Sequence, residues 1–167
     1  MNFEELLYTY KHRKIVMYLA DLYFNNEELK EQIKKHDMDK MFLLLFFEKK
    51  KINEFHRKMT SHHTNDIPKT KLDYMEMILD WESARYTKDG KPLNAYDTLY
   101  KYYPELEKEI LPILKDIGLD YSTLEKDEKV KEYAKTFDNT TIDDIREEFI
   151  DYINYAIPKG KTKQKAR

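Results

Sequence analysis

Residues that interrupt helices are scarce in this chain, and this scarcity limits the fold more than any other feature. The 167 residues include only three glycines and five prolines, the two residue types that most strongly mark turns and helix ends. Aromatic residues make up 14% of the chain, too many for a chain that is disordered along its whole length. We therefore expect an all-α fold, a single-domain bundle of about seven to eight helices.

Apolar residues recur at three- and four-residue steps along much of the chain, as they do on the buried face of a helix. Leu7, Ile15 and Leu19 form one such stripe. Capping and turn residues separate this stripe from those that follow. The expected helices cover residues 3–24, 27–36, 38–59, 67–86, 94–102, 105–117, 122–136 and 141–157.

The longest apolar run, residues 41–47, is far shorter than the roughly 20 residues that a membrane span needs. We interpret this run as the core of a buried helix and expect no contact with a membrane. The first five residues include two glutamates and no basic residue, and they lack the basic-then-apolar form of a signal peptide. Cysteine is absent, which fits a reducing compartment. We expect a cytoplasmic protein.

All five histidines precede residue 64, and two aspartates complete an ordered set with them. The set is His12, His36, Asp37, His56, His62, His63 and Asp80. Its members come from separate expected segments, as do the ligands of metal sites inside helical bundles. Imidazole nitrogens and carboxylate oxygens are the ligands that divalent metals take where thiolates are absent. A carboxylate in apolar surroundings, such as Asp80 beside Trp81, needs a partner or a metal. The set therefore predicts a site for a divalent transition metal.

The order of these residues resembles that of the HD-domain superfamily of metal-dependent phosphohydrolases, which are all-helical and named for an adjacent His-Asp pair. The residues that match its basic metal site are His12, His36, Asp37 and Asp80. The residues that match the further histidines of two-metal members are His56, His62 and His63. Tyr8 stands where some three-metal members carry a glutamate. The resemblance therefore implies two ions of manganese, iron or zinc.

Lys40 follows His36 by four residues and resembles the lysine of the His-Asp-x-Gly-Lys motif in the cyclic-dinucleotide phosphodiesterase branch. Asp39 replaces the glycine of that motif, and the Gly-Tyr-Pro element of the branch is missing. Cyclic dinucleotides are therefore not implied as substrates.

A closer resemblance is to an uncharacterised HD-like family that combines the same histidine pattern with Glu-Met-Ile-x-Asp-Trp. The chain has this element at residues 76–81, followed by Lys91, Pro92 and Leu93. The likeness covers roughly residues 8–115. It implies an HD-like metal-binding core at residues 1–118 and appended helices of the same domain at 119–158. Residues 159–167 carry five basic and no acidic side chains, and we interpret them as a disordered basic tail. Contact of this tail with nucleic acid is the weaker alternative.

The resemblance also implies roles in catalysis. Asp37 would bridge the two ions, water activated by the ions would attack, and Lys40 would neutralise phosphate oxygens, aided by lysine or arginine side chains of the rim such as Arg85. The expected substrate is a small phosphorylated molecule, a nucleotide or another phosphoester. Glu76 is either a partner of a ligating histidine or a surface acid. Two other functions stay open: an HD-like di-iron oxygenase, and a non-enzymatic binding protein stabilised by metal. No oligomeric state is predicted.

Overall fold

The computed structural model describes residues 2–157, and these contain helices and no strand. The all-α prediction is therefore confirmed. The chain separates into two compact units, Met1–Phe137 and Asp138–Arg167. The basic tail expected at residues 159–167 lies outside the described residues. Among the described residues, no helix has both the length and the apolar character that crossing a membrane requires.

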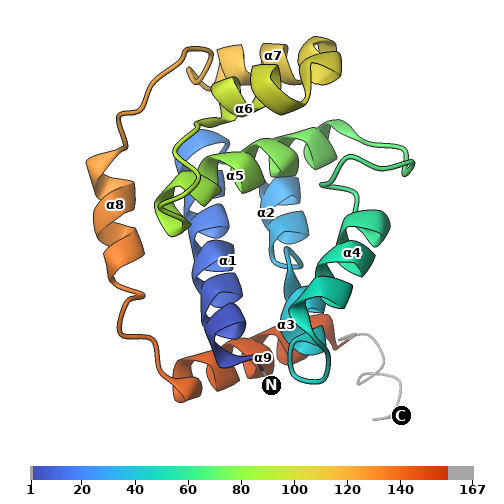
Figure 1. The fold of residues 1–167 in the computed structure, drawn as a ribbon, viewed down its shortest axis with the longest axis vertical. Helices are drawn as coiled ribbons and strands as arrows, with labels where there is room; N and C mark the ends of the chain where they lie inside the picture. The colour runs from blue at the N-terminus through green and yellow to red at the C-terminus, as the bar shows by residue number, and fades with distance from the viewer. Residues whose placement is uncertain (1, 158–167) are drawn as a thin grey trace, which may run out of the picture. The chain divides into compact units, whose positions relative to one another are not determined.

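The first unit contains eight α-helices and one short 3₁₀ turn within its described residues (Figure 1). The elements are α1 (Phe3–Tyr23), α2 (Glu27–Ile33), α3 (Met38–Leu43), α4 (Lys49–Met59), α5 (Lys71–Thr87), α6 (Ala95–Tyr102), η1 (Pro104–Leu106), α7 (Glu107–Asp116) and α8 (Glu128–Lys135). The second unit contains α9 (Ile142–Ala156). Each of the eight expected segments is helical over at least part of its length.

Helix α5 is the central element of the first unit. One side of it contributes Leu79 to an apolar cluster with Ile15 and Leu19 of α1, and α2 and α8 also pack there. Another side contributes Ile78 to a second cluster with Leu99 of α6 and with α7. Figure 1 shows α5 lying across α1. Because α5 is packed on both sides, side chains on this helix have fixed positions.

The start of α5 differs from the expectation of a helix that opens at Pro68. The helix begins at Lys71 because Thr70 and Asp73 form a capping box: the Thr70 side chain accepts from the backbone N–H of Asp73, and the Asp73 carboxylate accepts from the backbone N–H of Thr70. This exchange satisfies two amide groups that would otherwise lack partners at the start of the helix.

The prediction of one continuous helix over residues 38–59 was wrong. Helix α3 ends at Leu43, a turn follows, and α4 begins at Lys49. Met41 and Leu44 are buried, but the turn leaves Phe46 78% exposed and Phe47 56% exposed. The apolar run at residues 41–47 is therefore only partly core, because its second half leaves the helix and turns outward.

The helices expected after residue 119 belong to different units. Helix α8 lies in the first unit, where Val130 and Ala134 pack in the cluster of α1, whereas α9 lies in the second unit. Helix α8 begins at Glu128 rather than at 122. The segment before it is extended because the buried Arg85 donates hydrogen bonds to the carbonyls of Thr123 and Glu125.

Candidate metal centre

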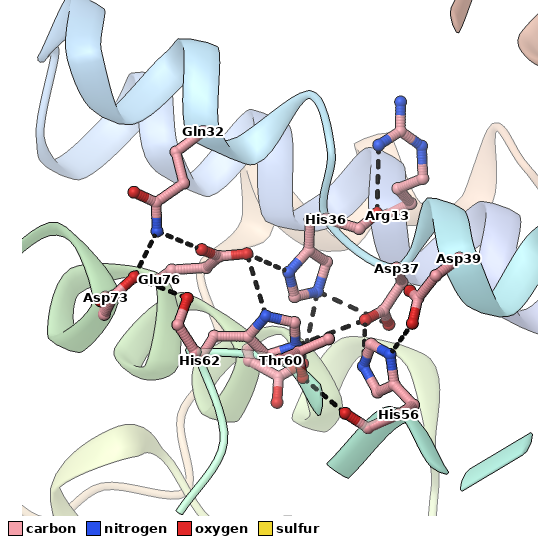
Figure 2. A network of polar contacts seen from close by, with 12 residues as sticks. Arg13, Gln32, His36, Asp37, Asp39, His56, Thr60, His62, Asp73 and Glu76 are labelled. Carbon is pink, nitrogen blue, oxygen red and sulfur yellow. Dashed lines mark hydrogen bonds and ion pairs between the residues drawn. The ribbon is translucent and has the colours of Figure 1, made fainter. Parts of the chain in front are cut away.

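The structure brings all seven predicted ligands together inside the first unit. Helix α1 carries His12, α4 carries His56, and α5 carries Asp80. The His36-Asp37 pair lies in the turn between α2 and α3, and His62-His63 lies in the loop between α4 and α5. Figure 2 shows four of these side chains, His36, Asp37, His56 and His62, pointing toward one another from three different segments.

The turn that presents Asp37 has an uncommon backbone. Asp37 adopts the left-handed conformation with φ +56°, which aspartate tolerates better than most residues other than glycine. The buried guanidinium of Arg13 on α1 stabilises the turn, because it donates to the carbonyl of Lys34 at 2.6 Å and to that of His36 at 3.1 Å. Helix α1 thereby fixes the His-Asp pair next to its own His12.

The first ligand group combines His12, His36, Asp37 and Asp80, whose ligand atoms all lie within 4.8 Å of one another. His12 Nε2 lies 3.3 Å from His36 Nε2 and 2.7 Å from Asp80 Oδ1. Asp37 Oδ2 lies 3.7 Å from His12 Nε2 and 3.6 Å from His36 Nε2. Donor atoms about 2.1 Å from a shared ion would stand about 3.0 Å apart in octahedral and about 3.4 Å apart in tetrahedral geometry. The spacing of this group fits one ion.

The remaining ring nitrogen of each histidine in this group has its own partner. His36 Nδ1 lies 2.9 Å from Glu76 Oε1, so it donates to this carboxylate. His12 Nδ1 lies 3.1 Å from Ser83 Oγ, and the Ser83 hydroxyl donates its proton to the carbonyl of Asp80. Ser83 Oγ therefore accepts from His12 Nδ1. With both Nδ1 atoms engaged in this way, the two Nε2 atoms are the ones that would give a lone pair to a bound ion, as ligating histidines do.

The second ligand group combines His56, His62 and His63, one nitrogen of each lying within 4.8 Å of the others. His56 Nε2 lies 2.9 Å and His62 Nε2 3.4 Å from Asp37 Oδ1. His56, which the sequence places in a polar stretch, is buried, and its Nδ1 lies 2.7 Å from Asp39 Oδ2. The two oxygens of Asp37 thus face different groups, Oδ2 the first and Oδ1 the second.

Three buried polar atoms at this junction have no hydrogen-bond partner: Asp37 Oδ1, His56 Nε2 and His62 Nε2. His56 Nε2 and Asp37 Oδ1 are close enough for a hydrogen bond, yet their directions do not form one. Buried polar atoms are rarely left without a partner, because each costs about 1–3 kcal/mol. Atoms that converge on a common point without bonding to one another are suited to an ion, and the donor set fits a divalent transition metal.

Charge at the centre favours cations. Burial lowers the pKa of His36, but the charge of Asp37 and the hydrogen bonds with Asp80 and Glu76 outweigh it and raise this pKa well above its usual value. Burial and the charge of His36 lower the pKa of His62, yet the nearby carboxylates of Asp37 and Glu76 raise it to about 9. The carboxylates thus attract protons onto these imidazoles, and a divalent cation would supply the same positive charge.

The carboxylates show the reciprocal effect. Burial raises the pKa of Asp37, but the charge of His36 and the close imidazoles of His56 and His62 hold it well below its usual value. Asp80 behaves in the same way through His12 and His36. Both aspartates are therefore ionised.

His63 differs from His36 and His62 of the centre. Burial lowers its pKa to about 3, so this imidazole is neutral, the form that ligates metal.

Glu76 orients one histidine of each group. Its Oε1 atom lies 2.9 Å from His36 Nδ1 and 3.1 Å from His62 Nδ1, and its Oε2 atom accepts from Gln32 Nε2 at 2.6 Å. Gln32 Nε2 also donates to Asp73 Oδ1 (Figure 2). Both oxygens of Glu76 are therefore engaged, which makes this residue a partner of the histidines rather than a ligand.

Several supporting residues were not predicted from the sequence. Ser83 stands three residues after Asp80, one helical turn away on the same helix, so its spacing offered a signal. Asp39 was noted only as a departure from the lysine motif, although it is the partner of His56. Nothing in the sequence marks Gln32.

A cavity of about 510 Å³ adjoins the centre. Lining residues include the ligands His12, Asp37, His56, His63 and Asp80, together with Lys40. Arg85 does not line it, so the expectation of a phosphate-binding role for Arg85 at the rim was wrong. Its guanidinium is buried, where it pairs with Glu82 at 3.2 Å and donates to the carbonyls of the segment before α8.

Comparisons of this chain with protein-family models, with curated proteins and with solved structures found no match. The resemblance to the HD-domain superfamily stays a prediction, which depends on the order of the ligand residues. The seven residues converge into two of the three groups of potential metal ligands found among the described residues, and the third group is His36, His62 and Glu76.

Proposed function

We propose that this protein is an HD-like metal-dependent phosphohydrolase that holds two divalent ions of manganese, iron or zinc. The observation that supports this most directly is the position of Asp37, whose Oδ2 faces His12 and His36 and whose Oδ1 faces His56 and His62. A carboxylate between two histidine groups is suited to bridge a pair of ions. Paired ions of this kind are typical of enzymes that cleave phosphoesters.

Asp37 and Lys40 would have different roles in phosphoester hydrolysis. When bound, the ions would withdraw charge from a phosphoryl group and make water more acidic. Asp37 would hold the two ions at a fixed separation, and its left-handed backbone directs it between the two groups. Lys40 lines the cavity and is close enough to Asp37 to lower its pKa. Its ammonium would therefore stabilise the charge that develops on the phosphoryl oxygens.

The nature of the cavity favours this function over the other two. Cationic side chains are the largest group of charges among its lining residues, and they suit an anionic substrate rather than a neutral one. A cavity that opens directly onto the ligands also favours a catalytic role over a purely structural metal, because structural sites are closed.

The experiment is elemental analysis of protein purified without added metal or chelator, together with turnover of a panel of phosphomonoesters and phosphodiesters. We expect about two transition-metal ions per chain, because there are two ligand groups, and hydrolysis of at least one class of ester. Asp37→Asn should remove both properties while keeping the fold, since asparagine also tolerates the left-handed backbone. Asp21→Asn, at an exposed position of α1, is the matched control and should behave as wild type.

Two results would contradict the proposal in different ways. The finding that wild-type protein carries only traces of transition metal would refute the proposed two-ion site. Stable mixed-valent iron with a paramagnetic signal, and no hydrolysis of any ester, would instead assign the centre to the oxygenase class.

A further inference from the structure

Five cationic side chains line the cavity next to the metal centre. They are Lys40, Arg57, Lys88, Lys91 and Lys101. Within residues 2–157, the acidic residues that line the same cavity are Asp37 and Asp80, both of which belong to the ligand groups. Any bound ions would use these two negative charges. The rest of the lining is therefore strongly cationic.

None of the five cations forms an ion pair with an acidic side chain among the residues that the structure describes. Lysines on other surfaces of the first unit do form such pairs: Lys30 with Glu27, and Lys131 with Glu128. Clustered cations without counter-charges repel one another, and an anionic ligand would relieve this repulsion.

Lys88 is the best defined member of this set. It follows the last residue of α5, and its Nζ lies 4.6 Å above the centre of the Tyr8 ring. Tyr8 in turn stacks on His12, with ring centres 6.0 Å apart. Tyr8 therefore contacts both the Lys88 ammonium and a member of the first ligand group, so that Lys88 is near the metal centre without belonging to it.

Lys40, Lys88 and Lys91 line the same cavity as the ligands. Burial lowers the pKa of Lys88 most, and the charges of Lys91 and Lys40 add to this effect. The charge of Lys40 also lowers the pKa of Asp37. Lys40 is therefore near both the metal centre and the turn after α5, which carries Lys88 and Lys91.

We propose that Lys88 and Lys91 form a second anion-binding subsite, which holds a phosphate group other than the one that is cleaved. The preferred substrate would then carry at least two phosphate groups. This proposal rests on the proposed function, since the ions and Lys40 are taken to hold the scissile phosphoryl group. A substrate with a single phosphate group, held by the ions and Lys40, would leave Lys88 and Lys91 without a counter-charge.

The test measures binding by calorimetry on the protein as purified, with its metal content determined before and after to detect chelation. The probes are inorganic phosphate, pyrophosphate and tripolyphosphate, with a sugar bisphosphate to distinguish separated from directly linked phosphates. We expect wild type to bind at least one of the multiply phosphorylated probes about tenfold or more tightly than phosphate, the effect of one further charge-assisted contact.

The Lys88→Met/Lys91→Met variant should reduce this affinity ratio to within about twofold of unity, because methionine keeps an apolar side chain and removes the charge. Lys91→Met alone, at an exposed position, should lower the ratio about threefold and serves if the double variant folds poorly. Lys129→Met, at an exposed position of α8 outside the cavity, is the matched control and should keep the wild-type ratio.

The outcomes separate the two proposals. A wild-type ratio near unity, or a ratio that survives both lysine variants, would refute the second subsite even if esters are hydrolysed. A ratio that depends on Lys88 and Lys91 would support the subsite even if no ester is turned over. In the latter case the hydrolase assignment alone would fail.

Discussion

Replacing Glu76 by glutamine tests whether one carboxylate orients histidines of both ligand groups. Glu76 accepts three hydrogen bonds, from His36, His62 and Gln32. Glutamine has nearly the same shape, but only one of its two terminal atoms can accept. If the amide oxygen stays with the two histidines, the amide nitrogen faces Gln32 Nε2, which is also a donor. If the amide turns round, its nitrogen faces two imidazole N–H groups.

The size of the effect follows from these contacts. Bonds to a charged group contribute about 1.5–3 kcal/mol and neutral ones about 0.5–1.5 kcal/mol, so neutralising the acceptor weakens each histidine bond by about 1 kcal/mol. The unpaired donor next to Gln32 adds about 1–3 kcal/mol to the loss of folding stability. Replacing such an outer partner of a ligating histidine typically lowers metal affinity about 10- to 100-fold. We expect Glu76→Gln to show both effects.

The assay is competition for the metal with a chromophoric chelator, alongside denaturant unfolding of the metal-free protein. Glu82→Gln is the matched control, since Glu82 is another buried glutamate of α5 that accepts hydrogen bonds from Arg85 and from the backbone N–H of Ala95. It should destabilise the fold by about 1–3 kcal/mol and leave metal affinity within about twofold. Equal affinities in Glu76→Gln and wild type would refute the orienting role. An equal loss in both variants would show a general effect of destabilisation.

Three further outcomes are expected. Asp39→Ala should weaken one metal-binding step about 10- to 100-fold and leave the other unchanged in a metal titration, because Asp39 contacts His56 of the second group alone. Removing metal by dialysis against a chelator should lower the free energy of unfolding, by about 2.7 kcal/mol for each ion lost relative to metal supplied at 100 times its Kd. Phe46→Ser should change unfolding stability by less than about 0.5 kcal/mol, since Phe46 is exposed, whereas Leu79→Ala in the core should cost about 2–5 kcal/mol in the same denaturant assay.

The fold class and the set of candidate ligands could be predicted from the sequence because both depend on residue type and order. Few breakers and a three- to four-residue apolar period are enough for an all-α prediction. The candidate ligands stand out because all five histidines fall into one ordered series with two aspartates, and the structure brings these residues together. The order of these residues could not predict which of them form each ligand group, or that the two oxygens of Asp37 face different groups, because both depend on the three-dimensional arrangement.

The partners of the histidines were harder to predict, because they depend on how helices approach one another. Gln32 contacts Glu76 across 44 positions of the chain, and Ser83 contacts His12 across 71. Polar residues of these types are common on any helix surface. No local pattern distinguishes Gln32, and only its spacing from Asp80 distinguishes Ser83. The sequence left two roles open for Glu76, a partner of a histidine or a surface acid. Its buried position between two imidazoles assigns it the first role.

The second ligand group depends on the helix break between α3 and α4, which brings His56 next to Asp37 and Asp39. In a continuous helix over residues 38–59, Asp39 and His56 would be separated by about 25 Å, at a rise of 1.5 Å per residue. In the structure the His56 ring lies 2.7 Å from the Asp39 carboxylate and 2.9 Å from that of Asp37. The turn between Leu43 and Lys49 must therefore return α4 alongside α3, and the exposure of Phe46 accompanies that return. The prediction of a single helix and the prediction of His56 as a ligand were thus incompatible, and the structure resolves the conflict in favour of His56 as a member of the centre.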